Sequence, residues 1–128
     1  MFEGIINGLF HALEGWNLLL IIFGTFLGIV FGSMPGLTAT MGLALLVPFT
    51  FGMEPAAGLI MLAGIYVGAM YADAIPAILI NTPGTPAAIA TTFDGFPLAQ
   101  KGMAQQALVT AAFASFVGSI IANIVLAT

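Results

Sequence analysis

Long apolar runs, separated by short polar or helix-breaking clusters, set the pattern of this chain. The first run extends from Gly15 to Met53 without a charged residue, and the last extends from Gly102 to Thr128. A helix that crosses a bilayer needs about 20 apolar residues. Each run is therefore long enough to supply at least one membrane-spanning helix.

The first run does not predict a single helix, because Pro35 and Gly36 interrupt it and Pro48 adds a further break. We predict a broken helical hairpin over residues 16–51, made of pieces 16–33 and 38–51. The second piece has about 14 residues and a length of about 21 Å, short of a hydrocarbon core of about 30 Å. A tilted, re-entrant or partly unwound element is therefore expected there.

Residues 1–14 have the period of an amphipathic helix. Polar residues occupy one side, and the apolar residues fall at i, i+3, i+4, i+7, i+8 and i+11: Phe2, Ile5, Ile6, Leu9, Phe10 and Leu13. Such a helix is typical of one that lies along the membrane interface. Trp16, which follows it, suits the aromatic belt at that depth.

Glu54 and Pro55 mark the start of the next helix, with the carboxylate near its positive end. Pro76 predicts a kink, and the helix should stop at the breaker cluster 81–84. Thr85 and Pro86 then read as the N-cap and first residue of a short helix, so that this unit covers residues 55–92.

Asp94 to Pro97 are expected to form a turn outside the helices. A final span should cover residues 100–128, and it ends without a polar flank. We therefore expect residues 1–128 to be a single transmembrane domain and the N-terminal part of a larger carrier.

Composition supports the membrane assignment, because 61% of the residues are hydrophobic and 5% are charged, against about 25% charged in soluble domains. Lys101 is the one Lys or Arg, which excludes nucleic-acid binding through clustered cations. The absence of cysteine excludes disulfides and thiolate metal sites. His11 has no second ligand nearby, so no metal site is expected. The predicted fold class is an all-α, multi-span membrane protein.

The two Pro-Gly breaks are the predicted binding site. In lipid, broken helices persist only where they line a cavity or are buried in protein, and paired breaks point to a transporter site. Free N–H groups and the positive helix end after each break can bind an anion. The candidate substrate-binding residues are Pro35, Gly36, Thr38, Asn81, Thr82, Pro83, Gly84 and Thr85. The alternative is that these prolines and glycines merely let helices pack closely.

Asp73 is a candidate polar or coupling residue, since a carboxylate at the bilayer centre costs about 2.5–3.5 kcal/mol. The alternatives are a place near the interface or a cap on the helix that begins near Ile75. Asn81 is expected to be a buried amide that needs partners. Glycines at 24, 28 and 32 predict a close-packed helix contact rather than a phosphate loop.

Several segments together resemble the large membrane subunit (TctA family) of bacterial tripartite tricarboxylate transporters. They are Gly28–Leu37, Pro48–Gly52, Tyr66–Tyr71, Ile78–Pro86 and Thr92–Gly102. One departure is Ala72-Asp73, where the family more often has two glycines.

The resemblance implies a multi-pass carrier of the bacterial inner membrane that imports citrate or related carboxylates by symport with a cation. It also implies a small membrane subunit and a periplasmic solute-binding protein as partners, and Na⁺ or H⁺ as the coupling ion without any other cofactor. No nucleophile with a base is visible, so an enzyme is not expected. The alternative function is a small self-associating membrane channel or holin-like protein.

Overall fold

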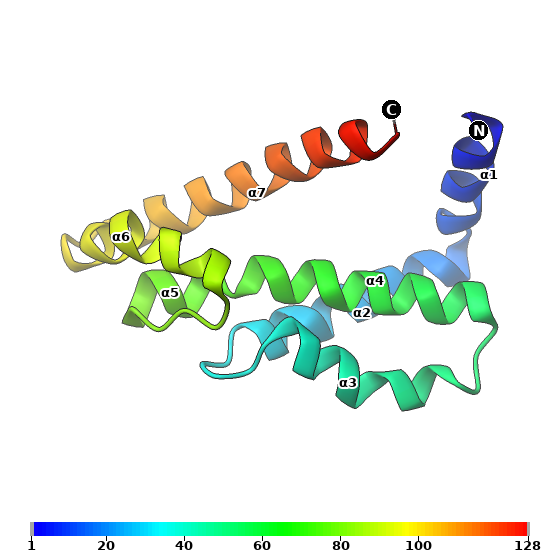
Figure 1. Ribbon diagram of the computed structural model, residues 1–128, viewed down its shortest axis with the longest axis horizontal. Helices are drawn as coiled ribbons and strands as arrows, with labels where there is room; N and C mark the ends of the chain where they lie inside the picture. Colours follow the sequence, from blue (N-terminus) through cyan, green and yellow to red (C-terminus); the bar gives the residue numbers. More distant parts are fainter. Residues whose placement is uncertain (1, 128) are drawn as a thin grey trace.

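The computed structural model describes residues 2–127, and within that range it holds seven α-helices and no strand (Figure 1). The helices are α1 (Phe2–Ala12), α2 (Gly15–Gly32), α3 (Ala39–Thr50), α4 (Pro55–Ala72), α5 (Ala74–Ile80), α6 (Pro86–Gln100) and α7 (Ala104–Ala127). The predicted all-α class is therefore confirmed.

In the described part of the chain, three helical segments are long and apolar enough to cross a membrane: α2, the combined α4–α5 segment Pro55–Ile80, and α7. Helix α3 is apolar but shorter. Its 12 residues span about 18 Å, which is less than a hydrocarbon core of about 30 Å. This agrees with the short element expected after the first break.

Helices α2 and α4 form the tightest pair in the molecule, and glycines lie at their contact (Figure 1). A Cβ at three of the α2 glycines would overlap an α4 backbone atom, in the pairs Gly24 with Met61, Gly28 with Ile65, and Gly32 with Ala69. The residue numbers of the two helices increase in the same direction along the contact, so the helices run parallel. The predicted glycine contact is confirmed.

The contact is reciprocal, because α4 presents glycines to the backbone of α2. A Cβ at Gly64 would lie 2.9 Å from the carbonyl oxygen of Ile21, and one at Gly68 would overlap that of Thr25. Buried Leu20, Met61 and Ile65 form the apolar core beside this contact. The core therefore lies between two helices whose backbones nearly touch.

Helix α3 connects the C-terminal end of α2 to the N-terminal end of α4. A Cβ at Gly42, near the start of α3, would lie 3.4 Å from the Phe31 side chain, and a Cβ at Gly58 of α4 would lie 3.2 Å from Cβ of Thr50, at the end of α3. Pro48 lies inside α3 rather than ending it. The turn between α2 and α3 therefore sits at the same end of the pair as the C-terminus of α4 (Figure 1).

Helix α4 is interrupted at Asp73 and continues as α5. The interruption falls one turn before Pro76, which has no N–H and whose ring would meet the carbonyl of Ala72 in a continuous helix. The kink expected from Pro76 thus begins slightly earlier in the chain.

The predicted turn at Asp94–Pro97 is wrong, because α6 continues through it to Gln100. Gly95 does not have a positive φ; it is buried, and a Cβ there would lie 2.7 Å from Cγ1 of Ile78. This glycine therefore serves the close packing of α6 on α5. Pro97 is accommodated within the last turn of α6.

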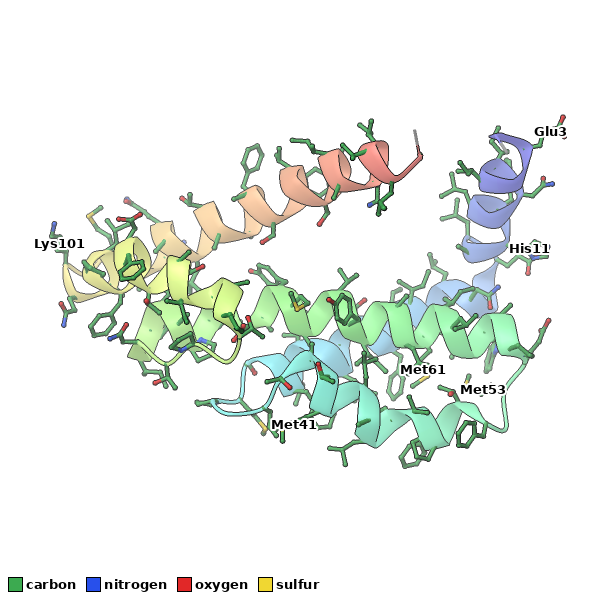
Figure 2. All side chains as sticks on the ribbon, in the orientation of Figure 1. Glu3, His11, Met41, Met53, Met61 and Lys101 are labelled. Atoms are coloured by element: carbon green, nitrogen blue, oxygen red, sulfur yellow. The ribbon has the colours of Figure 1, made fainter. Side chains whose placement is uncertain are left out.

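Helices α1 and α7 extend away from the packed helices (Figure 1). Figure 2 shows Glu3 and His11 on the side of α1 that faces away from the rest of the molecule. Apolar side chains of α1 are also exposed, with Leu9 at 61% and Phe10 at 69%. Exposed Trp16 follows α1. An interfacial position for residues 1–14 stays a prediction.

Candidate functional site

The first break is a tight turn followed by a capped helix. The Leu37 N–H donates to the Met34 carbonyl at 3.2 Å, and Gly36 between them has a φ of 88°. Proline and then glycine at the two central positions fit a type II turn, which needs a positive φ at the second. Thr38 then caps α3, its hydroxyl oxygen accepting from the Met41 N–H at 3.3 Å.

The second break begins at Asn81, which has left-handed backbone geometry (φ 56°) and closes α5. The Asn81 N–H donates to the Pro76 carbonyl, and so does the Thr82 N–H at 3.2 Å, so the end of α5 is closed by backbone hydrogen bonds. Asparagine adopts this conformation more readily than most residues with a side chain. The expected buried amide is wrong, because Asn81 is exposed and its visible role is this backbone turn.

Asp73 lies at the α4–α5 interruption and is 4% exposed. Its Oδ1 accepts from the Gly84 N–H at 2.7 Å, and its Oδ2 accepts from the Thr85 hydroxyl. It makes no side-chain cap on α5, so that alternative is wrong. The carboxylate instead occupies the donors at the entrance to α6.

Gly84 brings the two breaks together. A Cβ there would lie 2.6 Å from Oδ1 of Asp73 and 3.4 Å from the backbone carbonyl oxygen of Leu37. Leu37 belongs to the first break and Gly84 to the second. The absence of a side chain at 84 therefore lets a carboxylate, a carbonyl and an amide meet at one point, which we call the break junction (Asp73, Gly84, Thr85 and Leu37).

The break junction has a negative charge without a positive partner in the described part of the chain. Lys101 follows the last residue of α6, about 24 Å along that helix from Thr85. His11 pairs with Glu14 at 3.2 Å on the exposed side of α1. The Asp73 carboxylate is thus held by an N–H group, a hydroxyl and the positive end of α6 alone.

The eight predicted binding residues divide into three groups by position. Gly84 and Thr85 lie in the break junction, beside half-buried Pro83 and next to the first break. Pro35, Gly36, Asn81 and Thr82 are exposed at the outer parts of the two turns, and the Thr82 hydroxyl donates to the Ile80 carbonyl at 3.1 Å. Half-buried Thr38 supports α3.

Sequence reasoning missed two features of the junction. It did not pair Asp73 with Gly84 and Thr85, although a buried carboxylate requires donors and a helix start provides them. It also missed the Leu37 carbonyl, because a backbone group near the junction cannot be predicted from a pattern of side chains. Among residues 2–127, no cluster of three metal-ligating side chains occurs.

A cleft lies elsewhere, between α4 and α7. It has a volume of about 670 Å³ and is lined by the two tyrosines of α4 and by small residues of α7 such as Ser115 and Ser119. None of the predicted binding residues lines it. Two broken segments that meet at a buried carboxylate are a more specific arrangement than this open, mostly apolar groove.

Helices of spanning length within the described residues make this an all-α membrane protein, and two breaks in contact at a buried carboxylate are an arrangement typical of transporters. Comparison with known proteins gives the family. Residues 18–128 match the model of the tripartite tricarboxylate transporter TctA family, and the chain belongs to it.

A curated relative from Agrobacterium vitis is described as an uncharacterized 52.8 kDa protein in the TAR-I ttuC' 3' region. It is 44% identical over 116 residues, which cover 91% of this chain and 23% of the relative. The chain therefore spans about a quarter of that relative's length. No solved structure matches.

Proposed function

We propose that this chain forms part of the membrane subunit of a secondary carrier that imports tricarboxylates such as citrate, or related carboxylates. The break junction is the observation that carries the proposal. It already holds one carboxylate by an amide N–H and a hydroxyl at a helix start, without arginine or lysine. A substrate carboxylate presents the same atoms to the same donors.

The broken helices support a carrier rather than a catalyst. Backbone groups that leave a helix inside a membrane need partners in the protein or in a water-filled cavity. Here they meet one another and Asp73, and family membership points to transport. That membership also favours a carrier over a self-associating channel or holin-like protein.

The proposed carrier lies in the bacterial inner membrane as a multi-pass protein. It works with a small membrane subunit and receives its carboxylate from a periplasmic solute-binding protein. A gradient of Na⁺ or H⁺ drives uptake, with Asp73 as the candidate coupling residue, and no other cofactor is required. Substrate binds between the two breaks at Gly36, Thr38, Gly84 and Thr85, next to Pro35 and the 81–83 turn.

The proposal is tested by uptake of labelled citrate into cells that lack their own carrier and express the full-length protein with both partner subunits. We expect accumulation that stops when the binding protein is omitted or when ionophores collapse the cation gradients. Separate ionophores for H⁺ and Na⁺ identify the driving ion. Uptake that persists without any gradient would show a channel or exchanger instead.

A further inference from the structure

The donors at the start of α6 have an occupant from this chain. Asp73 is 4% exposed, and each of its oxygens accepts one hydrogen bond, from the Gly84 N–H and from the Thr85 hydroxyl. If the substrate carboxylate of the proposed function binds these donors, then Asp73 must leave them. One carboxylate would replace another of the same chemistry.

When Asp73 leaves these donors, the free-energy cost of its buried charge rises. While bound, the carboxylate benefits from two donors and from the positive end of a 15-residue helix. Once released, it has no charged or hydrogen-bonding partner among the contacts described, and a buried unpaired carboxylate is strongly unfavourable. It becomes stable again by binding a cation.

No neighbouring group supplies that cation. The first break, α5 and the 81–85 turn contain no ionisable side chain. Asp73 itself lies just before α5. Tyr71 on α4 and Asp94 on α6 are the nearest ionisable residues on the two flanking helices, and neither is cationic. Among the described residues near the break junction no side chain supplies the cation, and the inference takes it from solution.

We propose that Asp73 is an exchangeable internal anion that couples substrate binding to cation uptake. Without substrate it occupies Gly84 and Thr85; a substrate carboxylate takes over these donors, and released Asp73 takes one cation. For a proton, an O–H bond forms on the carboxylate and no bond breaks within the protein. For Na⁺, the carboxylate oxygens become ligands. This inference rests on the proposed function.

The test uses purified full-length carrier with citrate as the probe. Calorimetry in two buffers of different ionisation enthalpy gives the protons taken up per citrate bound. A second series at constant pH varies Na⁺. We expect one cation per citrate in the parent, seen either as proton uptake or as Na⁺-dependent affinity.

Asp73→Asn and Asp73→Gly are the decisive variants, and Asp94→Asn is the matched control because it removes one exposed carboxylate on α6. Both Asp73 variants should lose the cation dependence. Asp73→Gly should also bind citrate about tenfold more tightly, since the internal competitor is gone and a helix end contributes on that scale. Asp94→Asn should retain the cation dependence of the parent.

Thr85→Val gives an independent measurement if the Asp73 variants do not fold. It removes one of the two bonds that hold Asp73, so the half-saturating cation concentration should fall. Cation dependence that is unchanged in the Asp73 variants, or in Thr85→Val, overturns the inference. So does a parent that binds citrate without a cation. A parent that binds no citrate defeats the proposed function and, with it, the inference.

Discussion

The α2–α4 contact and the break junction both depend on glycine, but the glycines face different partners. In the first, Gly28 faces the backbone of Ile65 on a rigid helix. In the second, Gly84 faces the side-chain oxygen of Asp73 and, at ordinary contact distance, the Leu37 carbonyl. A side chain at 28 would thus have to move a helix, whereas one at 84 would first have to move a carboxylate.

The two regions also differ in polarity. The α2–α4 contact buries apolar side chains and backbone, and its only requirement is close approach. The break junction buries a formal charge with hydrogen-bond donors and no cation. We infer that substitutions in the first region alter folding, and that those in the second alter binding before they alter folding.

The largest expected effect is that of Gly28→Ala. Its Cβ would overlap the Ile65 carbonyl oxygen and lie 2.9 Å from the Ala69 nitrogen, so α2 and α4 must separate. We expect a loss of about 3 kcal/mol, the upper part of the range for overpacking, because the obstructing atoms are backbone. Thermal unfolding in detergent and abundance in the membrane measure it.

Gly8→Ala is the control for that experiment, since no atom lies within 4 Å of its Cβ position. It should leave both abundance and unfolding unchanged. Equal stability of Gly28→Ala and Gly8→Ala would show that the two helices do not rely on this contact.

The next effect is that of Gly84→Ala on transport. The new Cβ would displace Oδ1 of Asp73, so the variant should reach the membrane but take up labelled citrate at least about tenfold more slowly, the effect of losing about 1.4 kcal/mol of binding. Thr25→Ala is the control, because Thr25 lies at the α2–α4 contact beside Gly64 and Gly68 and not at the break junction. The comparison is made at matched abundance.

Adding Asp73→Gly to Gly84→Ala sharpens this prediction. The double variant removes the carboxylate that the new Cβ would overlap, so citrate binding measured by calorimetry should recover relative to Gly84→Ala alone, while cation-driven uptake should not, because the coupling carboxylate is absent. If Gly84→Ala instead loses abundance as Gly28→Ala does, then position 84 is a packing position like those of α2.

The sequence predicts most of the elements because each has a strong local pattern. Apolar runs place α2, α4 and α7, and Pro-Gly clusters place both breaks. It fails at Asp94–Pro97, where a turn-like composition lies within α6, because buried Gly95 packs against Ile78. Tertiary contact there outweighs local propensity.

The residues of the candidate site could be predicted from the sequence, but the contact between the two breaks could not. Both breaks and Asp73 stand out in the sequence because Pro-Gly pairs and a charge are unusual in apolar runs. Their meeting depends on the parallel packing of α2 on α4, which aligns the first turn with the end of α4. No local pattern encodes that register.

A smaller effect is expected at Asn81. The experiment distinguishes substrate binding by the Asn81 amide from a role in the backbone turn alone. Its left-handed backbone suits glycine, so Asn81→Gly should keep stability, while Asn81→Ala should cost about 1 kcal/mol. If the amide binds substrate, Asn81→Gly will still lose citrate uptake. If the residue serves only the turn, Asn81→Gly will transport as the parent does, which removes Asn81 from the binding site.

The smallest effect is expected at Thr38, which connects the two regions by starting α3 next to the first break. Its hydroxyl oxygen accepts from the Met41 N–H, so Thr38→Ala should lose a helix cap worth about 0.5–1 kcal/mol. Thr38→Ser keeps the oxygen and should be neutral in thermal unfolding. If citrate affinity follows the same order, with serine equal to threonine and alanine weaker by no more than about fivefold, then Thr38 acts by holding α3. A loss of binding far beyond that, with stability retained, would place the Thr38 hydroxyl in direct contact with the substrate and extend the binding site from the break junction into α3.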